Sequence, residues 1–78
     1  MAKVTIYSTP TCVYCKMAKG FFSDNKVAFE EKDVALDMQA REEMVKKSGQ
    51  FGVPVIDIDG NIVVGFDKAR LSELLGVK

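Results

Sequence analysis

Cys12-Val13-Tyr14-Cys15 carries both cysteines of this 78-residue chain, between a β-branched apolar stretch and a helical pattern. A thiol attacks a disulfide only when it is partly ionised, and the first turn of a helix favours the thiolate through unpaired backbone N–H groups and the positive dipole end. Cys12 is expected at the helix start, and Cys15 one turn further in, where the helix shields it more. The spacing therefore predicts a redox pair in which Cys12 attacks and Cys15 resolves.

Two other interpretations of the spacing are weaker. Cys-x-x-Cys also supplies half of many zinc sites. The chain has no histidine and no third cysteine, so only a dimer sharing two pairs could complete a thiolate cage. A purely structural disulfide would close a very small loop and would stabilise the fold little. We therefore expect no metal site.

Length, composition and charge indicate a small globular protein. Residues 1–78 allow a single domain with one modest core. The formal net charge is zero, so nothing favours nucleic acid or an anionic membrane as a partner. No apolar signal segment or membrane-length run is present, and we expect a cytoplasmic monomer. In a reducing cytoplasm, a close cysteine pair is more often catalytic than permanently bridged.

The first half of the chain predicts a strand, a helix and a second strand. Val4 to Tyr7 reads as a strand, followed by a turn-prone loop. Val27 to Val34 mixes apolar and charged residues, as expected of a strand near a sheet edge with solvated charges. The helix between them ends at Asp24-Asn25, and its expected core positions are Met17, Ala18, Phe21 and Phe22.

A second helix is predicted between Asp37, a suitable N-cap, and Gly49, a suitable stop. Glu42/Lys46 and Glu43/Lys47 would form outward pairs one turn apart. The side chains expected to point inward are Ala40, Met44 and Val45.

A hairpin and a last helix complete the predicted order βαβαββα. Residues 53–58 and 61–64 flank Asp59-Gly60, a two-residue turn typical of antiparallel hairpins. Asp67 can cap the last helix, which would end at Gly76. Its apolar face would consist of Leu71, Leu74 and Leu75.

Taken in order, Cys12-Val13-Tyr14-Cys15, Val53-Pro54 and Gly65-Phe66-Asp67 resemble the glutaredoxin family of the thioredoxin fold, over nearly the whole chain. The resemblance implies an α/β, thioredoxin-like domain: a four-stranded mixed sheet with the first and third helices on one face and the second on the other. It also implies thiol–disulfide exchange on protein or glutathione mixed disulfides. Glutathione would be a co-substrate, with no metal or organic cofactor.

The resemblance extends to the surroundings of the cysteines. In the family, the proline matching Pro54 is cis and faces the cysteine pair, which leaves the Val53 backbone free to pair with an extended peptide or with glutathione. The alternative is that Pro54 merely begins a strand. Lys16 would add a positive charge beside the site, or would be an ordinary surface lysine. The residues expected to bind substrate or glutathione are Thr11, Tyr14, Gln50, Val53, Pro54, Gly65, Phe66 and Asp67.

Two departures from the family pattern concern the reductant. Glutaredoxins usually carry a lysine three residues before the first cysteine and an Arg-Thr-Val-Pro run, whose cations hold the carboxylates of glutathione. The matching positions here are Thr9 and Phe51-Gly52, so weaker glutathione binding is expected. Val13 between the cysteines, together with Gly65-Phe66, also resembles redoxins that serve ribonucleotide reductase and draw electrons from thioredoxin reductase.

Two functions of other classes stay open. Some glutaredoxins carry a [2Fe-2S] cluster between two protomers, held by the first cysteine of each and two glutathiones. The second cysteine, Cys15, favours redox exchange instead, and so does the expected weakness of the glutathione site. A plain interaction module could use Phe51 and Phe66 as an apolar patch unless both are core, but such a module would not need Cys12.

Overall fold

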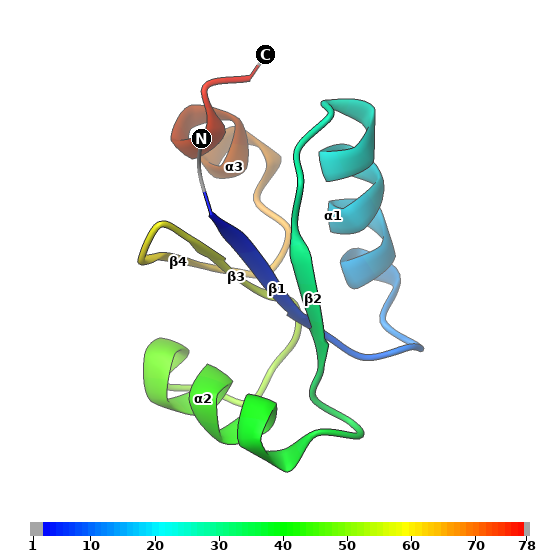
Figure 1. The fold of residues 1–78 in the computed structure, drawn as a ribbon, viewed down its shortest axis with the longest axis vertical. Helices are drawn as coiled ribbons and strands as arrows, with labels where there is room; N and C mark the ends of the chain where they lie inside the picture. Colours follow the sequence, from blue (N-terminus) through cyan, green and yellow to red (C-terminus); the bar gives the residue numbers. More distant parts are fainter. Residues whose placement is uncertain (1–2, 78) are drawn as a thin grey trace.

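The structure is a computed structural model that describes residues 3–77, which form a four-stranded sheet and three helices (Figure 1). The strand order is β2-β1-β3-β4; β1 is parallel to β2 and antiparallel to β3, and β3 is antiparallel to β4. This mixed sheet confirms the predicted fold and places β2 at an edge. The elements are β1 (Val4–Ser8), α1 (Val13–Asp24), β2 (Glu30–Asp33), α2 (Met38–Ser48), β3 (Val55–Ile58), β4 (Asn61–Val64) and α3 (Lys68–Leu75).

Short polar side chains and glycines set the ends of α2 and α3. Asp37 and Asp67 cap these helices, because their carboxylates accept hydrogen bonds from backbone N–H groups of the first turn. Gly49 and Gly76 end the same helices in the left-handed conformation. Both caps and both stops are confirmed.

The hairpin between β3 and β4 has the turn that its sequence predicts. Asp59 and Gly60 both adopt positive φ, at 53° and 91°, as a type I′ turn requires. The Gly60 N–H also donates a hydrogen bond to Asp57 Oδ1 at 2.7 Å. Ile58 pairs with Asn61 directly across the turn, which confirms the predicted register.

The two faces of the sheet bury separate cores. The face that α1 and α3 cover buries Val4, Ile6, Ala18, Phe21, Phe22, Ile56, Ile58, Val63 and Leu71. The opposite face, covered by α2, buries Tyr7, Val34, Ala40, Met44 and Val55. In Figure 1, α2 accordingly lies apart from α1 and α3, as the family resemblance implies. No helix within residues 3–77 combines the length and apolarity needed to cross a membrane.

Two details of α1 and β2 differ from prediction. Met17 is 48% exposed rather than buried. Cys15 and Ala18, on either side of it in sequence, occupy the buried face of the helix. β2 is shorter than the predicted Val27–Val34, because the Val27 N–H donates to the carbonyl of Phe22 at 2.8 Å and so belongs to the turn that ends α1.

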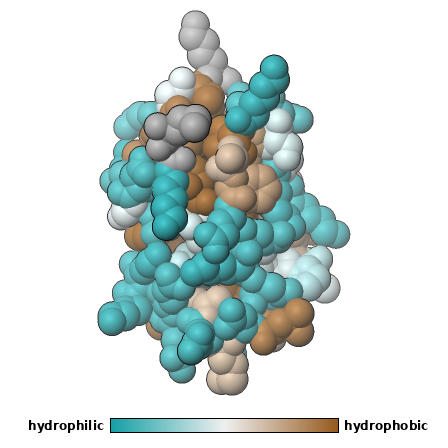
Figure 2. Space-filling model, viewed as in Figure 1, coloured by the Kyte–Doolittle hydropathy of each residue, from teal (hydrophilic) through white to brown (hydrophobic). Residues whose placement is uncertain are grey.

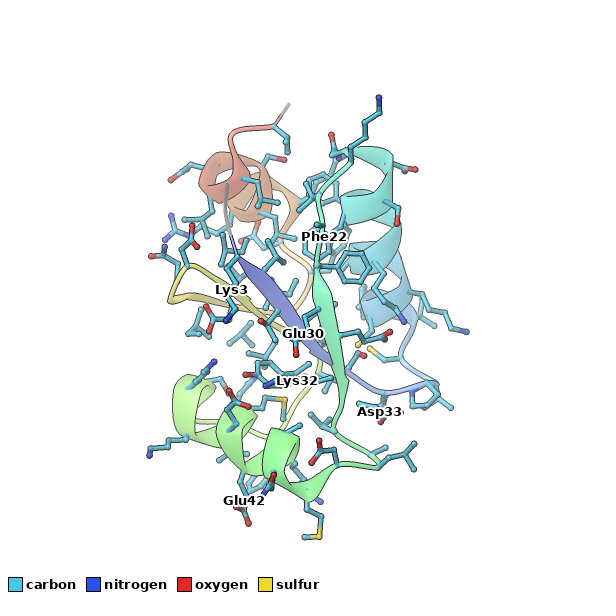
Figure 3. The ribbon with its side chains drawn as sticks, viewed as in Figure 1. Lys3, Phe22, Glu30, Lys32, Asp33 and Glu42 are labelled. Atoms are coloured by element: carbon cyan, nitrogen blue, oxygen red, sulfur yellow. The ribbon has the colours of Figure 1, made fainter. Side chains whose placement is uncertain are left out.

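The charges of β2 and α2 are not simply solvated, although hydrophilic groups cover much of this side of the molecule (Figure 2). Lys32 forms an ion pair with Glu43 at 2.9 Å, and Lys47 approaches the other oxygen of Glu43 at 3.3 Å. Figure 3 shows Lys32 between the sheet and α2, whereas Glu42 points away from the sheet. Within residues 3–77, no ion pair joins Glu42 to Lys46, so only one of the two predicted pairs forms.

Candidate active site

Three segments far apart in the sequence meet at one end of the sheet. β1 ends just before the cysteine loop, and Tyr7 near its end pairs with Val55, the first residue of β3. Val53-Pro54 immediately precedes that residue. Val55 also pairs with Val64, the last residue of β4, after which comes Gly65-Phe66-Asp67. The sheet register therefore brings the cysteine loop and both other segments to the same end.

Cys12 is the N-cap of α1, with extended φ and ψ of −82° and 115°. Its N–H donates to the carbonyl of Thr9 at 3.3 Å, which closes the loop after β1. Its sulfur is partly exposed and accepts a hydrogen bond from the Cys15 N–H at 3.2 Å. The Cys12 sulfur is thus held at the start of the helix by a backbone hydrogen bond and is open to an incoming disulfide.

Cys15 lies one turn further along α1 and is fully buried. Burial and, to a lesser extent, the hydrogen bond with Cys12 raise the pKa of the Cys15 thiol to about 12. The Thr9 backbone N–H and the charge of Lys19 act in the opposite direction. Both cysteines are free thiols in this structure. The two sulfurs therefore differ in exposure and in hydrogen bonding, as the sequence predicts.

The Val53-Pro54 peptide bond is cis, as the family resemblance implies. Pro54 is buried, and its carbonyl accepts a hydrogen bond from the Gly65 N–H at 2.8 Å. This bond ties the second segment to the third. Val53 is half-buried, and among residues 3–77 no hydrogen-bond partner reaches its backbone groups. The Val53 backbone is thus free to pair with an added strand.

Phe66 and Asp67 are held by the fold around them. Phe66 packs partly buried against the core, with its ring edge-on to Phe21 at 6.0 Å between centroids. Asp67 is exposed, and its carboxylate accepts the Arg70 N–H at 3.1 Å as the cap of α3. Of the two aromatic rings considered for an apolar patch, Phe66 therefore belongs to the core edge.

The rim beside the cysteines is apolar and open. Tyr14 is 61% exposed and Val13 is 66% exposed, so neither packs into the core. Thr11 and Lys16 are also exposed. All four side chains therefore face solvent beside the cysteine pair.

Arg41 is a cation beside Phe51 that the sequence pattern does not indicate. Phe51 is 68% exposed, and the guanidinium carbon of Arg41 lies 5.3 Å from its ring centroid. Both line a shallow groove of about 330 Å³ along α2, together with Met38, Glu42, Val45 and Lys46. Gln50, which precedes Phe51, is half-buried. The Ser48 hydroxyl accepts a hydrogen bond from the Gln50 N–H and donates one to the Gln50 carbonyl. No local signal identifies Arg41, because the contact joins α2 to the loop beyond it.

No cluster of three or more cysteine, aspartate or glutamate side chains within residues 3–77 is arranged to hold a metal ion. The chemistry that the site can perform with its own groups is sulfur exchange at the two thiols.

The fold and the cysteine pair define a redoxin of the thioredoxin fold. Residues 4–63 match the family model for glutaredoxin. The chain belongs to the glutaredoxin family, and the family implies thiol oxidoreductase activity.

Individual relatives agree with this placement. The chain is 51% identical over 72 residues to an uncharacterized glutaredoxin-like 8.6 kDa protein in the rubredoxin operon of Clostridium pasteurianum, covering 92% of this chain and 96% of that one. It is 43% identical to glutaredoxin 3 of Escherichia coli, covering 86% and 81%. It is also 34% identical to the glutaredoxin-like protein NrdH of Lactococcus lactis, covering 91% and 97%.

A solved structure is similar over its whole length. A mutant form of the thioredoxin-like protein BC3987 superposes with a TM-score of 0.93 at 36% identity, and all of both chains is covered.

Proposed function

We propose that this protein reduces disulfides by a dithiol mechanism in which Cys12 is the nucleophile and Cys15 the resolving thiol. The observation that carries the proposal is the contrast between the two sulfurs. Cys12 is accessible and accepts the Cys15 N–H, whereas Cys15 is buried behind it. An incoming disulfide can reach only the first sulfur.

The exchange has two steps. The Cys12 thiolate bonds to one substrate sulfur, the substrate S–S bond breaks, and the leaving thiolate takes up a proton. Cys15 then gives up its proton and bonds to the Cys12 sulfur, the mixed disulfide breaks, and the second substrate thiolate takes up a proton. Two electrons pass from the dithiol to the substrate, and an external thiol reductant restores Cys12 and Cys15.

We place the substrate across the end of the sheet where the three segments meet. The free backbone groups of Val53 would pair with an extended peptide or with glutathione, and Thr11, Tyr14 and the segment at Gly65 would flank it. Gln50 precedes Val53 by three residues and Asp67 follows Gly65 by two, and both would contact the same substrate. These roles follow from the open backbone of Val53 and the exposure of the neighbouring side chains.

The electron donor is either glutathione or a protein, and the surface near the cysteines suits protein partners at least as well as glutathione. Thr9 and Phe51 occupy positions where the family carries cations, so fewer cations are available to bind the carboxylates of glutathione. Arg41 supplies one cation near Phe51, but its guanidinium is directed to the ring. The exposed apolar side chains Val13, Tyr14 and Phe51 suit a protein surface, which keeps thioredoxin reductase and a ribonucleotide reductase substrate as the second candidate pathway.

One coupled assay tests both donors. The oxidised protein is given either glutathione with glutathione reductase or thioredoxin reductase alone, and NADPH oxidation is followed with the same disulfide substrate. We expect the thioredoxin reductase arm to be at least as fast as the glutathione arm. A rate confined to the glutathione arm would contradict the proposed preference, and no rate in either arm would contradict the function itself.

A further inference from the structure

Three polar side chains from three different elements meet on the α1 side of the sheet. Glu31 Oε2, on β2, accepts hydrogen bonds from Lys19 Nζ at 2.6 Å and from Ser8 Oγ at 2.7 Å. Ser8 is the last residue of β1 and is only 1% exposed. Glu31 therefore holds the Lys19 ammonium at a fixed place against the sheet.

That place is on the face of α1 that also carries the buried thiol. Lys19 follows Cys15 by one helical turn on α1, and residues four apart share a helix face. The Lys19 charge favours the thiolate of Cys15 and so opposes the effect of burial on the pKa of that thiol.

The other charged groups nearby are directed elsewhere. Asp33 accepts hydrogen bonds from the N–H groups of Ala35 and Leu36, and Lys16 is exposed on the surface of α1. Cys12 is the remaining titratable group that faces Cys15. Lys19, with Glu31 behind it, is thus the ion pair placed to act on this sulfur.

We propose that Lys19 is a positioning residue for the resolving step, and that Glu31 limits its effect. The inference rests on the proposed function, because it concerns the step in which Cys15 attacks the mixed disulfide on Cys12. In that step the Cys15 thiol loses its proton, its sulfur bonds to the Cys12 sulfur, and the substrate leaves as a thiolate that is then protonated. A nearby ammonium stabilises the transient Cys15 thiolate, and the Glu31 carboxylate offsets part of that ammonium charge.

The two partners of the ion pair should therefore affect Cys15 in opposite directions. The test uses a Cys12→Ser background, in which iodoacetamide reacts with Cys15 alone at a fixed alkaline pH below the pKa of the thiol. Lys19→Met should slow alkylation by about threefold or more, and Glu31→Gln should accelerate it by a similar factor, since the rate follows the thiolate fraction. With both cysteines present, the collapse of a glutathione mixed disulfide on Cys12 should change in the same order.

Controls separate this role from a structural one. Both substitutions break the same ion pair, so a purely structural effect would move both rates in one direction. Lys19→Arg keeps the charge and should keep the rate. Lys46→Met removes a lysine from α2, across the sheet, and should change nothing. Both side chains of the pair are partly exposed, at 28% and 41%, so the variants should fold, and thermal melts verify it.

Rates that change in the same direction, or that match Lys46→Met, would overturn the inference. The alkylation experiment needs no substrate, so its result does not depend on whether the proposed function is correct. That function fails if the Cys12→Ser protein still reduces disulfides, whatever the Cys15 rates are.

Discussion

At the scale of single residues, the surroundings of Cys12 and Cys15 differ although they are one turn apart. The first caps α1 and accepts a backbone N–H, and the second is enclosed by the core. The sequence predicts this difference because it depends only on where a helix begins. Arg41 could not be predicted in the same way, since its place over Phe51 depends on how α2 packs against the loop that follows it.

Thr9→Lys should strengthen glutathione binding, because it restores a cation three residues before Cys12. A charged hydrogen bond to a carboxylate contributes roughly 1.5 to 3 kcal/mol. If about 1.4 kcal/mol of it is realised, the glutathione concentration for half-maximal turnover falls by about tenfold. Steady-state kinetics at varied glutathione, with one disulfide substrate, measure this change.

Thr9→Met is the matched control, since it adds a chain without a charge and should leave glutathione dependence unchanged. Phe51→Arg is a less clean test, because the new guanidinium would stand beside that of Arg41. If Thr9→Lys and Thr9→Met have the same glutathione dependence, the shortage of cations does not explain the choice of reductant.

At the scale of elements, helix ends and the hairpin follow from local chemistry, and so they were predictable. Asp caps, left-handed glycines and the Asp59-Gly60 turn need no tertiary information. The start of β2 was not predictable because Val27 joins the turn that ends α1. The orientation of Met17 was not predictable because it depends on how α1 docks on the sheet.

Alanine at two glycines should have opposite effects on stability. Gly20 lies inside α1 with open space around a new Cβ, so Gly20→Ala should raise the free energy of unfolding by roughly 0.5 to 1 kcal/mol. Gly60 has φ of +91°, which L-residues rarely adopt, so Gly60→Ala should lower it by about 1 kcal/mol. Urea titrations of both variants measure this. Equal effects of the same sign would contradict the assigned turn.

The ion pairs between α2 and the sheet should make stability depend on acid pH. The hydrogen bond with Lys32 lowers the pKa of Glu43 from 4.5 to about 2. The unfolded chain therefore binds more protons than the folded one between these values, and the free energy of unfolding falls as pH drops from about 4.5 to about 2. Glu43 is 38% exposed, so solvent screening keeps the effect modest.

Urea titrations across this pH range should show a shallower loss of stability in Glu43→Gln than in the parent protein. Because other carboxylates titrate in both proteins, the difference between the two curves is the informative quantity. Parallel curves would show that Glu43 does not contribute to the pH dependence.

At the scale of the whole molecule, the site exists because the sheet register brings separate segments to one end. The order βαβαββα and the motif resemblance were sufficient to predict the fold and the helix layers. The resemblance also implied that Pro54 faces the cysteine pair, and it put Gly65 among the residues expected to bind substrate. The hydrogen bond from Gly65 to Pro54 and the link from Lys19 through Glu31 to Ser8 were not predictable, because each joins side chains or backbone groups across elements.

In the mechanism that we propose, Cys12 attacks the substrate and Cys15 completes the exchange. The most direct test treats the Cys12→Ser and Cys15→Ser proteins with a protein disulfide substrate and identifies covalent adducts by mass spectrometry. We expect Cys15→Ser to accumulate a mixed disulfide on Cys12, because no second thiol resolves it, and Cys12→Ser to form no adduct. An adduct on Cys15 in the Cys12→Ser protein, with none on Cys12 in the Cys15→Ser protein, would contradict it.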